Sequence, residues 1–219
     1  MADELRAQFG ASTTLIAKDL SQPAAADEVA GILQESGVDV HVLINNAGYA
    51  MWGPFVETSL EDELRMVQVN VVALTSLAKL VLRDMVKRGS GRVMNVASTA
   101  AFQPGPLMAV YYASKAYVLS FSEALVEELR GTGVTVTALC PGLTRTGFQR
   151  RAGIEHTRLV AAGMMDAKTV AERGYRGMMR GEDIVIPGFR NQFFAELASV
   201  APRSWVRRVV RRLQEARHT

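Results

Sequence analysis

The stretch that decides the fold is Val40-His41-Val42-Leu43-Ile44-Asn45-Asn46-Ala47-Gly48. Its first five residues form a nearly continuous apolar run, which is typical of a strand covered on both faces. Strands of this kind belong to parallel sheets, in which the chain between two strands usually forms a helix. The stretch therefore predicts an α/β protein.

Further segments alternate between strand and helix patterns. Residues 92–97 and residues 134–140 indicate strands, and the segment 109–130 between them indicates a helix that Gly131 ends. This alternation predicts a parallel sheet flanked by helices in a single domain over residues 1–219.

Helical patterns also occur before these segments. Residues 1–10 indicate an amphipathic helix, and residues 23–35 indicate a second helix with Ser21 as its N-cap. A capping box at Thr58-Ser59-Leu60-Glu61 begins a long helical region that reaches residue 88. Asn70 lies among the apolar residues of that region, so it is either hydrogen-bonded at a kink or catalytic.

The remaining segments have weaker patterns. Residues 13–17 indicate a strand, and residues 182–186 indicate a short final strand. Residues 143–166 show no clear periodicity, so we expect a loop with short helices there.

The helix over residues 109–130 carries Tyr111-Tyr112-Ala113-Ser114-Lys115. Positions i and i+4 share one face of a helix, so the phenol of Tyr111 should lie near the ammonium of Lys115. A nearby cation lowers the pKa of a phenol from about 10, which makes the pair an acid–base device. Tyr112 is the rival, but it lacks this spacing. The alternative interpretation is two packed aromatic rings and a solvated lysine.

Several polar positions occur together with this pair in a fixed order. This order resembles the short-chain dehydrogenase/reductase family over about residues 13–188, through Asn45-Asn46-Ala47-Gly48, Asn70, Ser98, Tyr111-x-x-x-Lys115 and Pro141-Gly142. The resemblance implies a Rossmann-like doubly wound sheet and an oxidoreductase that uses NADP or NAD. It also implies a small-molecule carbonyl or alcohol substrate and a homo-oligomer.

The resemblance implies a role for each catalytic candidate. Tyr111 would exchange a proton with the substrate oxygen, Ser98 would donate a hydrogen bond to that oxygen, and Lys115 would hold the nicotinamide ribose. Asn70 would support a water-linked proton relay to the lysine. A turn or capping role for Ser98 and a structural role for Asn70 are the alternatives.

The resemblance also implies a set of cofactor-binding residues. They are Asp19, Leu20, Asn46, Ala47, Gly48, Tyr111, Lys115, Pro141, Gly142, Thr144 and Thr146. Glycine at position 48 permits close backbone approach. A helix-capping Asp19, a sheet-stabilising segment at residues 46–48 and an ordinary turn at residues 141–142 are the alternatives.

One element of the family is absent from the 219 residues, namely the opening strand with its turn Thr-Gly-x-x-x-Gly-x-Gly. By resemblance, residues 1–10 match the second helix and residues 13–17 match the third strand. We therefore expect the chain to lack the family's first strand, first helix and second strand. Without them, the strand at residues 40–44 has an unpaired edge. Either the first residue is an internal methionine of a longer product, or the short chain is real and binds cofactor weakly.

Three classes of function follow from these observations. The first is a reductase, and the second is a catalytically impaired remnant that acts as a binding or assembly protein. A hydrolase that uses Ser98 is the third. The histidines His41, His156 and His218 have no metal-like spacing.

An apolar substrate pocket is expected beside the catalytic candidates. Its predicted residues are Phe102, Pro104, Leu107, Met108, Phe148, Met164 and Met165. Such a lining suggests a ketone, an acyl chain or a steroid-like molecule.

Composition and charge limit the remaining possibilities. Hydrophobic residues make up 48% and charged residues 21%, and no apolar run suggests a membrane span. Cys140 is the only cysteine, so no internal disulfide can form and we expect a cytoplasmic protein. Residues 203–219 hold six arginines against Glu215, a balance of +5 within a net charge of +3. The basic charge thus belongs to a C-terminal helix, and nucleic-acid binding is not predicted. That helix covers its own domain or a subunit interface, or it contacts a membrane surface or an acidic partner.

Overall fold

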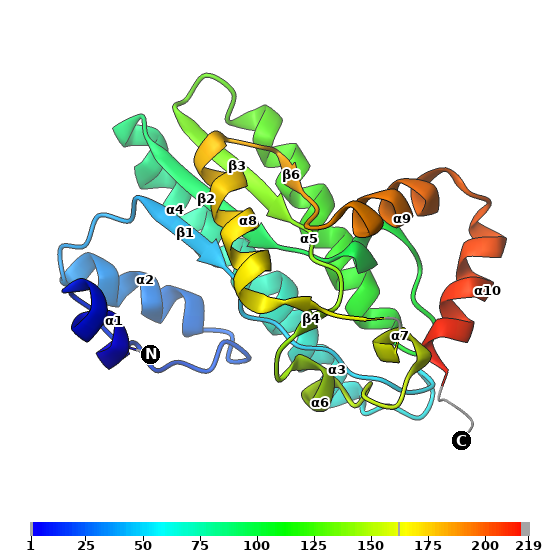
Figure 1. Ribbon diagram of the computed structural model, residues 1–219. Helices are drawn as coiled ribbons and strands as arrows, with labels where there is room; N and C mark the ends of the chain where they lie inside the picture. The colour runs from blue at the N-terminus through cyan, green and yellow to red at the C-terminus, as the bar shows by residue number, and fades with distance from the viewer. Residues whose placement is uncertain (1, 162, 216–219) are drawn as a thin grey trace.

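A sheet of four parallel strands in the order β1-β2-β3-β6 forms the centre of the molecule (Figure 1). The structure is a computed structural model, which describes residues 2–161 and 163–215. The strands are β1 (Val42–Asn45), β2 (Gly91–Val96), β3 (Val134–Leu139) and β6 (Ile184–Val185). All three neighbouring pairs are parallel, which confirms the predicted α/β fold.

Helices cover both faces of this sheet. On one face, α4 (Leu74–Arg88) and α5 (Ala109–Glu128) pack against Val93 and Val136. On the other face, α8 (Ala167–Arg180) packs against Met94 of β2. Successive residues of a strand point to opposite faces, so an apolar run such as β2 fills both cores.

The outer edge of β1 is unpaired, as predicted, because no strand within residues 2–161 and 163–215 lies beside it. Val42 and Ile44 on this strand are 41% and 47% exposed. The predicted strand at residues 13–17 is wrong, because this segment has no neighbouring strand with which to form hydrogen bonds. Leu15 within it is 78% exposed.

Two helices, α1 (Ala2–Phe9) and α2 (Ala25–Glu35), flank that extended segment. The predicted N-cap at Ser21 is wrong, since α2 begins four residues later after Ala24, whose side chain makes no capping hydrogen bond. Asp19 instead stabilises the preceding turn, because its Oδ1 accepts a hydrogen bond from the Ser21 N–H at 3.0 Å.

The long helical region consists of α3 (Leu60–Val67), a π-helical segment η1 (Gln68–Ala73) and α4. Its N-cap is Ser59 and not Thr58, because the Ser59 hydroxyl accepts from the Asp62 N–H at 3.3 Å. At 29 residues the region is long and apolar enough to cross a membrane, contrary to the expectation from sequence. Some of its apolar side chains, among them Val81, Leu82 and Met85, pack in the core beside β1 and β2.

The segment after β3 contains short elements, as expected. They are β4 (Thr144–Arg145), α6 (Phe148–Ala152), α7 (Arg158–Ala161) and β5 (Met165–Asp166), and β4 pairs with β5. A short 3-10 helix, η2 (Thr99–Phe102), follows β2.

Two helices near the C-terminus were not predicted, namely α8 and α9 (Phe189–Val200). The predicted basic helix is α10 (Arg203–Gln214). Residues 216–219, with Arg217 and His218 among them, lie outside the described part of the chain. Figure 1 shows α9 and α10 at the side of the molecule away from α1 and α2.

Candidate active site

The candidate site lies at the carboxyl ends of three neighbouring strands. The segment after β1 supplies Asn46 and Gly48, and the segment after β2 supplies Ser98. The segment after β3 supplies Pro141 and Gly142. Parallel strands end at one edge of a sheet, so these segments meet there. They form one wall of a cavity of about 950 Å³, which α5 joins with Tyr111 and Lys115.

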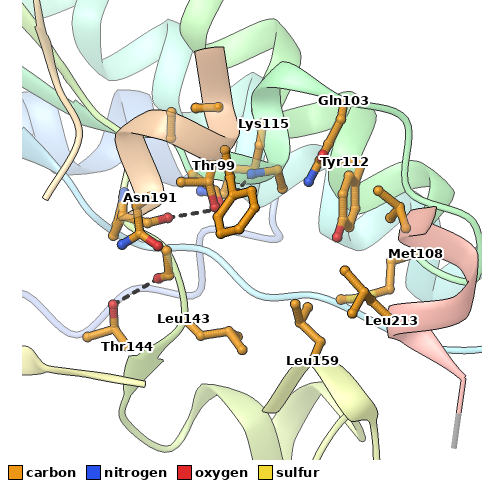
Figure 2. Close-up of a pocket in the computed structure, with 18 of the residues that line it drawn as sticks. Thr99, Gln103, Met108, Tyr112, Lys115, Leu143, Thr144, Leu159, Asn191 and Leu213 are labelled. Atoms are coloured by element: carbon orange, nitrogen blue, oxygen red, sulfur yellow. Dashed lines mark hydrogen bonds between the residues drawn. The ribbon is translucent and has the colours of Figure 1, made fainter. Parts of the chain in front are cut away.

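Most predicted site residues line this single cavity. They are Asn46, Gly48, Ser98, Tyr111, Lys115, Pro141, Gly142, Thr144 and Thr146. Figure 2 shows Lys115 and Thr99 on one side of the cavity and Leu159 and Leu213 on the other. Ser98, Tyr111 and Lys115 form the polar side of this largely apolar cavity, and Lys115 Nζ lies 5.9 Å from the centre of the Tyr111 ring.

Tyr111 and Ser98 form the centre of the polar side. Tyr111 is 8% exposed, and its burial raises the pKa of the phenol well above the ordinary value of 10, while a hydrogen bond with Ser98 opposes this rise. The Ser98 hydroxyl also accepts from the Ala100 N–H at 3.1 Å and donates to the Pro141 carbonyl at 3.4 Å. The phenol of Tyr111 therefore keeps its proton at neutral pH.

Lys115 is buried and not a solvated surface lysine. Its Nζ donates to the Val96 carbonyl at 2.7 Å, and burial lowers its pKa to about 8. Nζ lies 5.9 Å from the centre of the Tyr111 ring. The net shift of the Tyr111 pKa is upward and not downward as expected, because burial of the phenol is its largest cause.

Asn70 lies in the π-helical segment η1, and π-helical turns often mark functional sites. Its amide is fully engaged: Oδ1 accepts from the Tyr49 N–H at 3.1 Å, and Nδ2 donates to the Tyr49 carbonyl and to the Ser114 hydroxyl at 3.0 and 3.1 Å. Asn70 thus connects the segment after β1 with α5. This is the hydrogen-bonded arrangement that the sequence left as one of two interpretations.

Tyr112 has different partners from Tyr111. Its hydroxyl accepts from Gln214 Nε2 at 2.8 Å, and burial raises its pKa to about 12. The Trp52 indole donates to the Gln214 carbonyl at 2.9 Å, so Gln214 joins α10 to this part of the core. Of the two tyrosines, Tyr111 is the one whose pKa Ser98 lowers.

Three predicted cofactor residues lie apart from the main cavity. Asp19, Leu20 and Ala47 line a second, open pocket of about 420 Å³ together with Arg65. Hydrogen bonds from Ser21 lower the pKa of Asp19. The predicted cofactor residues therefore divide between two neighbouring pockets.

The apolar lining differs in part from the prediction. Met108, Phe148, Met164 and Met165 line the cavity as predicted. Phe102, Pro104 and Leu107 do not line it: Phe102 packs against the core around Val118, and Leu107 is buried with a left-handed φ of 69°.

Sequence reasoning missed the part of the lining that comes from the C-terminal helices. Asn191, Phe194 and Leu197 come from α9, and Trp205, Val209 and Leu213 come from α10. The i, i+4, i+8 spacing of the last three was the available signal. Within residues 2–161 and 163–215, no group of three or more His, Cys, Asp or Glu side chains is placed to hold a metal.

A parallel sheet with a cavity at the carboxyl ends of its strands defines an open α/β protein that binds ligands at that edge. Residues 1–156 match the profile of the family described as short chain dehydrogenase. The chain belongs to the short-chain dehydrogenase family.

Curated relatives share this part of the sequence. The ketoacyl reductase HetN of Nostoc sp. is 38% identical over 133 residues, which cover 60% of this chain and 46% of that protein. The very-long-chain 3-oxoacyl-CoA reductase of Mus musculus is 32% identical over 150 residues, which cover 67% of this chain and 47% of that protein. The chain thus spans about half the length of these relatives.

Solved structures share the fold over most of the chain. A short-chain dehydrogenase from Sphingobium yanoikuyae in complex with NADPH has a TM-score of 0.79 and 32% identity, and the match covers 92% of this chain and 80% of that one. A short-chain dehydrogenase/reductase from Burkholderia phymatum in complex with NAD has a TM-score of 0.78 and 26% identity, with 90% and 78% covered.

Proposed function

We propose that this chain carries the reacting end of an oxidoreductase that interconverts a carbonyl and a secondary alcohol of an apolar substrate with NADP or NAD. The observation that carries this proposal is that Ser98, Tyr111 and Lys115 line the same cavity, with Lys115 Nζ 5.9 Å from the centre of the Tyr111 ring. The apolar lining from α9 and α10 supports a substrate of low polarity.

The residues present fit one end of such a cofactor. A bound nicotinamide cofactor would supply or accept the hydride. A Cβ on Gly48 would lie 3.0 Å from Asn70 Oδ1 and 3.5 Å from Lys115 Nζ, so glycine lets these two side chains approach the backbone after β1. Gly48 and Lys115 both line the cavity in which the cofactor would lie. Lys115, mostly an ammonium at neutral pH, would donate to a ribose hydroxyl there. For the phosphates we assign no residue, since the glycine-rich turn is absent from the 219 residues.

The protein groups would act on the substrate oxygen. Burial keeps Tyr111 protonated, so it would donate its proton as negative charge develops on the carbonyl oxygen. The Ser98 hydroxyl would donate a second hydrogen bond to that oxygen and stabilise the charge. Asn70 would hold Ser114 and α5 in place and support proton resupply through Lys115.

The alternative of an impaired remnant is less well supported. The family contains relatives named as reductases, and the polar candidates converge on one cavity here. The hydrolase alternative is also disfavoured, because the Ser98 hydroxyl is engaged with two backbone groups.

The test compares two neighbouring tyrosine variants of the 219-residue chain. NADPH and NADH binding is measured by calorimetry, and turnover of apolar ketones is followed by loss of reduced-cofactor absorbance. We expect Tyr111→Phe to lose about 10²- to 10⁴-fold in kcat while it still binds cofactor. Tyr112→Phe is the matched control and should stay within a few-fold of the wild type. Full activity of Tyr111→Phe, or no cofactor binding by the folded wild type, would overturn the proposal.

A further inference from the structure

One face of α9 exposes large apolar side chains. Phe189, Phe193, Leu197 and Val200 follow one another at helical spacing and are 83%, 53%, 37% and 82% exposed. The opposite side of the helix packs against the protein, because Ala195 is buried and α9 contacts η2. A contiguous apolar stripe on one surface helix marks an interaction site more often than scattered exposed residues do.

The neighbouring helix α10 presents a set of cations. Its arginines are all exposed, and they are Arg203, Arg207, Arg208, Arg211 and Arg212. Val206 and Val210 face inward and are 5% and 4% exposed. Across residues 189–215, six arginines stand against two glutamates, a balance of +4. The basic face is therefore fixed in position by the buried face of the same helix.

Both helices contribute to the wall of the large cavity. Phe194 and Leu197 of α9 line it, as do Trp205 and Leu213 of α10. These four side chains are also 57%, 37%, 50% and 36% exposed, so they contact both the cavity and the outside. Figure 2 shows Leu213 at the side of the cavity away from Lys115.

We propose that α9 and α10 bind the surface of an anionic lipid membrane, with the stripe of α9 among the acyl chains and the arginines of α10 at the headgroups. Exposed aromatic side chains beside arginines are the features that favour this interfacial position. A second copy of the chain is a less suitable partner for this surface. A two-fold contact would place residues 189–215 of both copies, each with a charge of +4, against one another. The cavity-lining side chains that are also exposed, Phe194 and Trp205 among them, would then adjoin the lipid.

The test measures sedimentation of the 219-residue chain with vesicles of phosphatidylcholine alone or with phosphatidylglycerol added. We expect binding to the anionic vesicles that weakens as salt rises. Arg207→Gln with Arg208→Gln should lower the partition constant by roughly 20- to 30-fold, at about 1 kcal/mol per arginine. Phe193→Ser with Val200→Ser should lower binding to both kinds of vesicle.

Matched controls carry the same changes elsewhere on the surface. Arg83→Gln on α4 and Phe55→Ser, at a side chain that is 61% exposed, should leave binding unchanged. The proposal is overturned by no binding of the wild type, or by equal loss in the control variants. It is also overturned if sedimentation equilibrium without vesicles shows a dimer that Phe193→Ser with Val200→Ser dissociates. Because no cofactor or turnover enters this experiment, its outcome is independent of the proposed activity.

Discussion

Replacing Lys115 with methionine should stabilise the fold at neutral pH. The ammonium is 6% exposed, and its only bond from Nζ among the described residues is to the Val96 carbonyl at 2.7 Å. Burial lowers the pKa of Lys115 from 10.5 to about 8, so the folded protein holds this proton less tightly than the unfolded chain does. Methionine has a similar length and carries no charge to desolvate.

The pKa difference sets the magnitude. At pH 7 both states are protonated at Lys115, and the shift from 10.5 to about 8 corresponds to roughly 3 kcal/mol against folding. The variant also loses the hydrogen bond to the Val96 carbonyl, which reduces its gain in stability by about 1 kcal/mol. We therefore expect Lys115→Met to raise the free energy of unfolding by about 2 kcal/mol at pH 7.

The pH dependence has a definite sign. Between the folded-state pKa of about 8 and the unfolded value of 10.5, the unfolded chain binds more protons at Lys115. The wild type therefore gains stability from this group as pH rises, and the advantage of Lys115→Met should shrink by about 2 kcal/mol between pH 7 and pH 9.5.

Urea unfolding followed by circular dichroism at both pH values measures this difference. Lys79→Met on α4 is the control, because Lys79 is exposed and its loss should change stability by less than about 0.5 kcal/mol at either pH. A Lys115→Met protein that is less stable than the wild type at pH 7, or a gap that does not change with pH, would refute the reasoning.

Two further predictions concern the core. Gly177→Ala in α8 should destabilise the fold by about 1–3 kcal/mol, because the new Cβ would lie 2.2 Å from Val185 Cγ2. The Cβ of Gly31→Ala in α2 would meet no atom within 4 Å, so this variant should be about 0.5–1 kcal/mol more stable than the wild type. In thermal unfolding, the Tm should therefore fall for Gly177→Ala and rise for Gly31→Ala. The thiol of Cys140 is 0% exposed, and burial raises its pKa to about 12, so a thiol-reactive disulfide reagent should label the native chain at least about 10³-fold more slowly than the unfolded one. Equal labelling rates would contradict the buried position.

The sheet and its site were predictable where the sequence pattern is local. The strand over residues 92–97 and the helix that begins at residue 109 follow from apolar periodicity alone. The positions of Ser98 and Tyr111 then follow from parallel topology. Ser98 comes after the carboxyl end of β2, and Tyr111 lies near the start of the helix that follows, so both lie at the same edge of the sheet. The unpaired edge of β1 also followed from topology, because the order of strands leaves it without a neighbour.

Features that depend on tertiary contacts were not predictable in this way. The glycines of α8 weaken a helix pattern, yet Gly177 is needed because Val185 lies against it. The pattern at residues 13–17 suits a strand, but a strand requires a partner that the described residues do not supply. The pKa of Tyr111 depends on how deeply the ring is buried, and no spacing between residues in a sequence gives that.

The candidate site is held together by bonds among its own elements. Asn45 Nδ2 donates to Asn95 Oδ1 at 2.9 Å, and Asn95 Nδ2 donates to the Ser122 hydroxyl at 3.0 Å, which connects β1, β2 and α5. Asn70 connects η1 to α5, and Lys115 connects α5 to the end of β2. None of these bonds involves residues 2–41. The bonds that position Ser98, Tyr111 and Lys115 are therefore independent of the open edge of β1. We expect phosphate binding and proton transfer at Tyr111 to be separable by experiment.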